Sequence, residues 1–171
     1  MTTSNGSPPN IAALDPLDIA YLKKAVLQAK KAWKYNEVPV GSLVVRDGII
    51  LSAAFNRKES TCDPTAHAEL LAIRKAAKKI QDWRLDGATL YSTLEPCPLC
   101  AGAILQSRIA RVVFGAWDHR WGAAGSVLNV FEHSFNHSVE LVYADMPECA
   151  TVLKAFFRER RKISKPFLDS V

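Results

Sequence analysis

Two short segments of this 171-residue chain carry the residues whose types and spacing could do chemistry. One segment holds His67 and Glu69, and the other holds Cys97 and Cys100. Two cysteines three residues apart at a helix start share one face, where the helix dipole favours the thiolate form that binds metal. Two thiolates and one imidazole are a Cys₂His ligand set. The spacing therefore predicts a zinc site with His67, Cys97 and Cys100 as its ligands.

The number of protein ligands separates a catalytic zinc site from a structural one. Three protein ligands leave a position for water, whereas a structural zinc ion has four. No second Cys-x-x-Cys pair or His-x₃₋₅-His pair lies at a suitable spacing, although Cys62, Cys149 or another histidine could supply a fourth ligand. A redox dithiol is the alternative for Cys97 and Cys100, but it needs a thioredoxin-like context that this sequence lacks. We therefore expect an open, catalytic site.

Glu69 follows the predicted histidine ligand by two residues. On a regular helix, side chains with this spacing point about 200° apart, so both can face one site only near the helix start. A carboxylate beside the water of a catalytic zinc site is placed to transfer protons. The alternative is a solvated glutamate, and the adjoining ligand set favours the catalytic role.

Composition limits the class of protein. Hydrophobic residues make up 49% of the chain and charged residues 23%, which are ordinary globular values that exclude a disordered chain or a disulfide scaffold. No apolar run approaches the ~18 residues of a membrane span, and residues 1–14 contain neither Lys nor Arg, unlike a signal or transit peptide. We expect a cytoplasmic protein without a membrane partner, with a disordered tail at 1–14 and one domain at 15–171.

The net charge of +5 is concentrated in two segments. Residues 19–36 hold five lysines, and residues 151–171 hold six basic residues against two acidic ones. Two solvated helix faces would explain this pattern, and so would a surface for a polyanion such as RNA. Charge alone does not separate the two explanations.

Helix and strand patterns alternate along the chain. Asp15 and Pro16 precede an apolar stripe typical of a helix that ends near Asn36, and the Asp-Gly pair at 47–48 is typical of a hairpin turn. We expect strands at 40–46, 49–54, 88–93, 111–115 and 139–143, and further helices from 63 to about 80, at 96–107 and at 146–163. This order predicts an α/β fold, a three-layer αβα sandwich around a five-stranded mixed sheet. Periodicity places Phe156 and Phe157 in its core.

The His-x-Glu and Pro-Cys-x-x-Cys segments together are similar to the signature of the zinc-dependent nucleobase deaminases. Within that superfamily, residues 19–163 resemble the bacterial tRNA-specific adenosine deaminases. The matching segments include Asn-Glu-Val-Pro-Val-Gly at 36–41, Asp-Pro-Thr-Ala-His-Ala-Glu at 63–69, Thr-Leu-Glu-Pro-Cys at 93–97, Gly-Ala-Ala-Gly-Ser at 122–126, Asn-His at 136–137 and Phe-Phe-Arg at 156–158.

The resemblance implies a cytidine-deaminase-like fold, a homodimer and one zinc ion per subunit. It implies a hydrolase of amidine C–N bonds that converts the wobble adenosine of an arginine tRNA anticodon to inosine. Glu69 would transfer the protons. The nucleotide would lie among Asn56, Val40, Ala68, Leu94, Glu95, Pro96 and Asp118, and the tRNA anticodon stem-loop would contact Arg120, Phe157, Arg158 and Arg161.

Residues 117–121 depart from the family pattern, because Trp117 and Trp121 stand where the family has a smaller, lysine-containing run. Either indole could stack on RNA or fill a dimer interface. His119, His133 and His137 are interpreted as loop or capping residues rather than ligands, and a free thiol at Cys62 and buried packing of Cys149 are expected.

Two other functions remain open. The first is deamination of a free base or nucleoside such as guanine, cytosine or cytidine, which would have no need of the basic chain ends. The second is a non-catalytic zinc module that binds RNA, which predicts four zinc ligands and no effect of removing Glu69.

Overall fold

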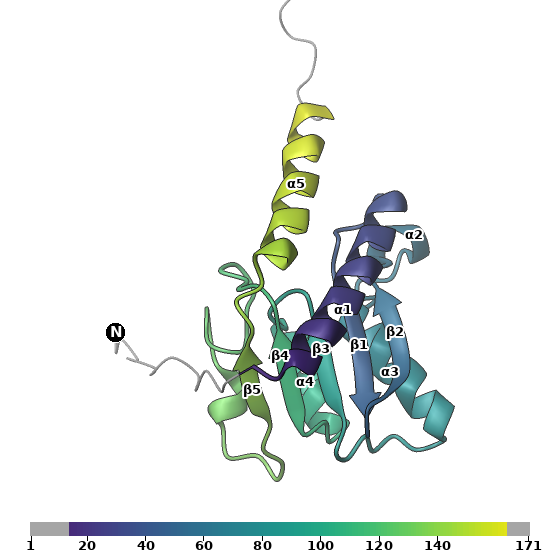
Figure 1. The fold of residues 1–171 in the computed structure, drawn as a ribbon, viewed down its shortest axis with the longest axis vertical. Coiled ribbons are helices and arrows are strands. Elements are labelled where there is room, and N and C mark those ends of the chain that lie inside the picture. Colours follow the sequence, from purple (N-terminus) through teal and green to yellow (C-terminus); the bar gives the residue numbers. More distant parts are fainter. Residues whose placement is uncertain (1–13, 164–171) are drawn as a thin grey trace, which may run out of the picture.

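The computed structural model describes residues 14–163, and helices cover both faces of its central sheet (Figure 1). The elements are α1 (Pro16–Lys34), β1 (Gly41–Arg46), β2 (Ile49–Phe55), α2 (Lys58–Thr61), α3 (Ala68–Ile80), β3 (Thr89–Ser92), α4 (Pro98–Gln106), β4 (Arg111–Phe114), the 3₁₀ helix η1 (Val130–Glu132), β5 (Glu140–Tyr143) and α5 (Pro147–Ile163). None of these helices is long and apolar enough to cross a membrane. The predicted tail falls almost entirely outside the described residues, so it and the single domain stay predictions.

The five strands lie in the order β2-β1-β3-β4-β5. Strand β1 is antiparallel to both of its neighbours, whereas β3, β4 and β5 run parallel to one another. The predicted mixed five-stranded sheet is therefore confirmed. Parallel strands place their carboxyl ends at one edge, where ligands bind in open α/β sheets. The segments after β3 and β4 leave the sheet at that edge, and they include the predicted cysteine ligands and the glycine-rich loop.

The core has two halves, one on each face of the sheet. Leu43 and Val45 of β1 pack with α1 and α5, whereas the intervening Val44 packs with α3 and α4. This alternation follows from the two-residue period of a strand. Both faces are apolar, which is why the strands read as continuous hydrophobic runs.

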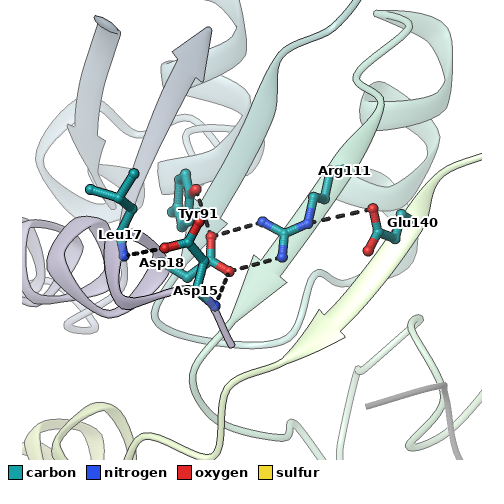
Figure 2. Close-up of polar contacts among 6 residues, drawn as sticks. All are labelled: Asp15, Leu17, Asp18, Tyr91, Arg111 and Glu140. Atoms are coloured by element: carbon teal, nitrogen blue, oxygen red, sulfur yellow. Dashed lines mark hydrogen bonds and ion pairs between the residues drawn. The ribbon is translucent and has the colours of Figure 1, made fainter. Parts of the chain in front are cut away.

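A partly buried ion pair between Asp18 and Arg111 fastens the start of α1 to the sheet (Figure 2). Asp15 caps the helix as predicted, and Asp18 completes a capping box. The Asp18 carboxylate also accepts two 2.8 Å hydrogen bonds from the Arg111 guanidinium and one of 2.8 Å from the Tyr91 hydroxyl. Burial alone would raise the pKa of Asp18, but the hydrogen bonds from Arg111 and Tyr91 outweigh it and lower that pKa below its usual value. Arg111 also approaches Glu140 at 3.5 Å, so the network spans β3, β4 and β5.

Two expected helix starts are wrong. The helix expected from residue 63 begins at Ala68, because Asp63 accepts hydrogen bonds from the Thr65 backbone and hydroxyl and closes a turn instead. An Asp-Pro pair favours such a turn as well as a helix cap. The helix expected from residue 96 begins at Pro98, because Cys97 has an extended backbone and caps it.

The two phenylalanines of the last helix also differ from each other. Phe156 is buried as predicted and packs edge-on against Trp33 of α1. Phe157 is 37% exposed, so its predicted place in the core is wrong. Adjacent residues on a helix point about 100° apart, and the sheet side of α5 accommodates only the first of the two rings.

Candidate active site

Three predicted ligands meet at two helix starts. His67 precedes the first residue of α3, Cys97 precedes the first residue of α4, and Cys100 lies in the first turn of α4. The His67 Nδ1 atom lies 3.5 Å from each sulfur, and the two sulfurs are 3.6 Å apart. Tetrahedral coordination with metal–sulfur bonds of about 2.3 Å and metal–nitrogen bonds of about 2.0 Å separates ligand atoms by roughly 3.5–3.8 Å. The three atoms thus fit the corners of one tetrahedral metal site.

The electrostatics of this cluster favour a thiolate at Cys97. The positive ends of the α3 and α4 dipoles both point toward it. The hydrogen bond with Cys100 lowers the pKa of Cys97 to about 4, although burial opposes the shift. The contact with Cys97 raises the pKa of His67. The hydrogen bond with Cys97, together with burial, raises the pKa of Cys100, so the shift toward thiolate falls on Cys97.

The ligand cluster found within residues 14–163 has three members, His67, Cys97 and Cys100. Cys62 is exposed at the end of α2, outside this cluster. Cys149 is buried in the core beside α1 and the sheet, and burial raises its pKa to about 12, as expected of a packing residue. A three-residue set fits the predicted open site rather than a saturated structural one.

Glu69 shares the cavity of the metal ligands. Its carboxylate is 4% exposed and accepts a 3.1 Å hydrogen bond from the hydroxyl of Ser92, at the end of β3. His67 has an extended backbone just before the helix, whereas Glu69 lies in the first turn. This change of backbone conformation lets residues two apart face one site. Burial raises the pKa of Glu69, as is suitable for a group that accepts and returns a proton.

The cavity has a volume of about 570 Å³, within the usual range for small-molecule sites. Five of the predicted substrate contacts line it, namely Val40, Asn56, Leu94, Glu95 and Asp118. The buried residues Ala68 and Pro96 are adjacent in sequence to lining residues but are not themselves among them. Sequence reasoning missed Val38, Lys58, Pro98, Leu99 and Trp121 as lining residues. Their common signal is proximity in sequence to a predicted site residue.

Asn56 is held in one orientation at the cavity wall. Its side-chain Oδ1 accepts a 2.8 Å hydrogen bond from the backbone N–H of Ala68, and the backbone N–H of Asn56 donates to the Val40 carbonyl. The amide oxygen is therefore committed to the protein, which leaves the NH₂ group to donate toward a ligand. An acceptor nitrogen of a purine suits that donor.

Glu95 lines the cavity, but its carboxylate bonds to the protein. It accepts hydrogen bonds from the backbone N–H groups of Asp118, Ala124 and Ser126 at 2.9–3.1 Å, and it is almost fully buried. These three hydrogen bonds fix the backbone of the loop after β4, residues 117–126, against the Glu95 side chain. We interpret Glu95 as a positioning residue for this loop rather than a direct contact of the nucleotide.

The two tryptophans of the loop 117–126 differ in burial. The ring of Trp117 packs against Phe114 and Tyr143, with centroid distances of 4.9 and 4.7 Å. Trp121 lines the cavity and is 68% exposed. Asp118, which follows Trp117, holds the backbone before Trp121. Its Oδ1 accepts hydrogen bonds from the backbone N–H groups of Arg120 and Trp121.

The predicted RNA contacts lie in two places. Arg120 is exposed on the loop that lines the cavity, whereas Phe157, Arg158 and Arg161 are exposed on α5, which projects beyond the sheet (Figure 1). Arg160 beside them donates to the Asn36 side chain just after α1, so the basic parts of α1 and α5 are adjacent. The structure does not bring the α5 residues into the cavity.

The remaining histidines lie outside the ligand cluster. His137 Nε2 is 2.7 Å from the Ile109 carbonyl oxygen, and His119 and His133 are exposed in loops. All three agree with the interpretation of loop residues.

Comparisons with known proteins agree with this geometry. The model of the MafB19-like deaminase family matches residues 18–161. The chain is 48% identical to the tRNA-specific adenosine deaminase of Bacillus subtilis, over 86% of this chain and 93% of that protein. It is 43% identical to that of Aquifex aeolicus, over 82% and 94%. A solved structure from work on tRNA:A34 deaminases, which edit the wobble position of transfer RNA, is 36% identical, with a TM-score of 0.76 over 79% of this chain and 99% of that one.

A guanine deaminase of Bacillus subtilis is a more distant structural relative. It is 26% identical, with a TM-score of 0.56 over 86% of this chain and 95% of that one. Its lower similarity agrees with the prediction that tRNA adenosine, rather than free guanine, is the substrate. On the matches to the adenosine-specific proteins, this chain belongs to the family of tRNA-specific adenosine deaminases.

Proposed function

We propose that this protein is a zinc-dependent hydrolase that converts adenosine to inosine at the wobble position of a tRNA anticodon, with arginine tRNA as the expected substrate. One observation carries the proposal. A buried glutamate and two members of a three-residue metal-ligand cluster line one cavity of nucleoside size, in a chain whose relatives are tRNA-specific adenosine deaminases.

The donor set supports zinc as the metal. His67, Cys97 and Cys100 would hold the ion, since two sulfurs and one imidazole at these separations suit tetrahedral zinc. When bound, zinc supplies a Lewis acid that lowers the pKa of water at the site. The set is formally neutral with Zn²⁺, so no further counter-charge is needed in the buried site.

Glu69 carries the protons of the reaction. Its carboxylate takes a proton from the water that attacks C6 of the adenine and returns it to the ring nitrogen N1. It then takes the proton of the new C6 hydroxyl and passes it to the amino group. The C6–N bond then breaks, ammonia leaves, and the ring carries the oxygen of inosine. The hydroxyl of Ser92 fixes the carboxylate during these transfers. Burial keeps bulk water from competing for the proton.

The other cavity residues orient the base. The NH₂ group of Asn56 donates to an acceptor nitrogen of the purine, and the side chains of Val40 and Leu94 pack on the ring. The backbone of Ala68 positions Asn56, and Glu95, Pro96 and Asp118 shape the loops around the base. Arg120, Phe157, Arg158 and Arg161 bind the anticodon stem-loop. A cytoplasmic location is consistent with a tRNA substrate.

The homodimer implied by the resemblance belongs to the same proposal. Val127, Leu128 and Phe135 are exposed apolar side chains near η1. They are available for burial against a second subunit. Sedimentation of the purified protein would give the oligomeric state directly.

A deamination assay tests the proposed reaction. The substrate is an arginine anticodon stem-loop with adenosine at the wobble position, beside free adenosine, cytidine and guanine, each at two salt concentrations. We expect inosine from the stem-loop alone, with a rate that falls as salt rises because phosphate contacts are screened. Turnover of guanine with an inert stem-loop would overturn the substrate and leave the basic helices as solvated faces. Metal analysis of the same preparation should find about one zinc ion per chain.

A further inference from the structure

We propose that Trp121 is a stacking platform for a nucleobase next to the target adenosine, and that it gives this enzyme preference for a nucleotide within a single-stranded loop over a free nucleoside. The inference rests on the proposed function and adds a specificity-determining residue to it.

The exposure of Trp121 is the first observation. Its side chain is 68% exposed, more than any other large apolar side chain within residues 14–162. It lines the same cavity as His67, Cys97 and Glu69. An indole at the mouth of a nucleoside-sized cavity offers a flat apolar face outside the space that the target base fills. A base that flanks the target would lie at this mouth.

The backbone beneath Trp121 is held firmly, which is the second observation. The carboxylate of Asp118 accepts from the Trp121 N–H, and the Asp118 carbonyl accepts from the Gly122 N–H at 2.8 Å and from the Ser126 hydroxyl at 2.7 Å. Glu95 then fixes the backbone of Asp118 from inside. A pre-organised platform loses little conformational entropy when a base stacks on it.

Positive charge flanks the platform. Arg120 is adjacent to Trp121 and exposed, and Lys58 is exposed and lines the cavity. An aromatic face beside basic side chains is the arrangement by which proteins bind single-stranded nucleic acid, with stacking on bases and cations near phosphates. The side chains at this mouth thus match a nucleotide chain rather than an isolated base.

A dimer interface is the competing role for Trp121. A second subunit seated on this ring would cover the mouth of the cavity that the substrate must enter. Trp117, in contrast, already has aromatic partners within the chain. We therefore assign base stacking to Trp121 and a packing role to Trp117.

The test compares Trp121→Ala, Trp121→Phe and the control Trp83→Ala. Trp83 is 54% exposed and lies beyond the far end of α3, about 18 Å of helix from the site. Three stem-loops serve as substrates: the intact loop, and loops with an abasic site immediately before or after the wobble adenosine. Steady-state kcat and KM are measured for each pair, together with the thermal midpoint of each variant.

We expect Trp121→Ala to raise KM for the intact stem-loop about 5- to 100-fold, the effect of losing one base–aromatic stack, and to change kcat little. Trp121→Phe should recover most of the loss, and Trp83→Ala should match the wild type. One of the two abasic loops should raise KM for the wild type by a similar factor. For Trp121→Ala, the KM for that abasic loop should be no higher than its KM for the intact loop.

Three outcomes in activity or assembly, and a fourth in thermal stability, would overturn the inference while the proposed function stands. Trp121→Ala could show wild-type KM on the intact loop, it could lose the same further factor as the wild type on both abasic loops, or it could become monomeric in sedimentation where the wild type is dimeric. A wild-type protein that fails to deaminate the intact loop would instead overturn the proposed function itself. A lowered thermal midpoint would mean a structural role for Trp121, which also contradicts the inference.

Discussion

The Oδ1 atom of Asn56 accepts a 2.8 Å hydrogen bond from the backbone N–H of Ala68. Ala68 stands between the proposed metal ligand His67 and the proposed proton carrier Glu69, at the first residue of α3. One hydrogen bond thus connects the residue proposed to orient the base with the helix start that supplies the chemistry. A shift of that helix start would move all three groups together.

Asn56→Asp separates base recognition from this structural bond. The carboxylate keeps an oxygen for the Ala68 N–H but replaces the NH₂ donor with an acceptor. We expect kcat/KM for the stem-loop to fall about 10- to 100-fold, because one substrate hydrogen bond becomes an unpaired contact. The thermal midpoint should change little. Asn56→Ala, which also removes the bond to Ala68, should lower both activity and the thermal midpoint.

Glu69→Ala tests the proton carrier. A general acid–base group contributes about 10²–10⁴-fold, and Glu69 serves every proton transfer, so we expect a loss at or above this range. Zinc content should stay near that of the wild type, because the ligand cluster contains no glutamate. Single-turnover assays with excess enzyme measure the loss, and near-wild-type turnover would refute the mechanism.

Glu95→Gln tests the positioning of the loop after β4. The amide replaces one carboxylate oxygen by an NH₂ group, which then faces a backbone N–H donor in place of an acceptor. We expect the free energy of unfolding to fall by about 1–3 kcal/mol, the cost of an unmet buried donor. The KM for the stem-loop should rise as well, because Asp118 and Trp121 lose their support. Glu132→Gln, at an exposed position of η1, is the matched control and should change neither quantity.

Asp18→Asn tests the ion pair of Figure 2 through its pH dependence. The folded-state pKa of Asp18 lies below its ordinary value of 3.8. The ion pair therefore stabilises the fold above about pH 5, and this contribution is lost as pH falls through the ordinary pKa toward the lowered one. At pH 7 we expect a loss of about 2–3 kcal/mol in the free energy of unfolding, somewhat less than for a fully buried pair.

The control for this experiment is the ion pair of Lys30 and Glu148. Its atoms are 2.9 Å apart, but its side chains are 51% and 44% exposed. Glu148→Gln should therefore change the free energy of unfolding by less than about 1 kcal/mol. Chemical denaturation at pH 7 and pH 3 measures both variants, and the difference between Asp18→Asn and the wild type should shrink at pH 3. An equal difference at both pH values would contradict the pKa shift.

The meeting of His67, Cys97 and Cys100 could be predicted from sequence, because metal chemistry dictates both the types and the spacing of such residues. Cys97 and Cys100 must share a helix face, and no other pair in the chain does so with a proline before it. The capped start of α1 at Asp15 and Pro16 could be predicted for a similar reason, since both signals act within one turn. Local rules suffice where the determining contacts are local.

Other features depend on contacts between distant residues. The bonds of Glu95 reach N–H groups 23, 29 and 31 residues away, and no local pattern encodes them. Trp117 and Trp121 are four residues apart in one loop, and only the neighbouring strands decide which ring is covered. The start of α3 could not be predicted, because Asp63 could either cap a helix or close a turn. The extended backbone of His67, which brings that residue to Cys97 and Cys100, is compatible only with the turn.

The clamp on α1 also bears on the order in which the chain folds. Asp18 lies 73 residues before Tyr91 and 93 before Arg111. During synthesis, the N-terminal helix can form by its own caps as soon as it leaves the ribosome, but it cannot be locked until β4 has been made. Arg111, the ion-pair partner of Asp18, is a residue of that fourth strand. The first helix to be synthesised is therefore secured only after two thirds of the described residues have left the ribosome.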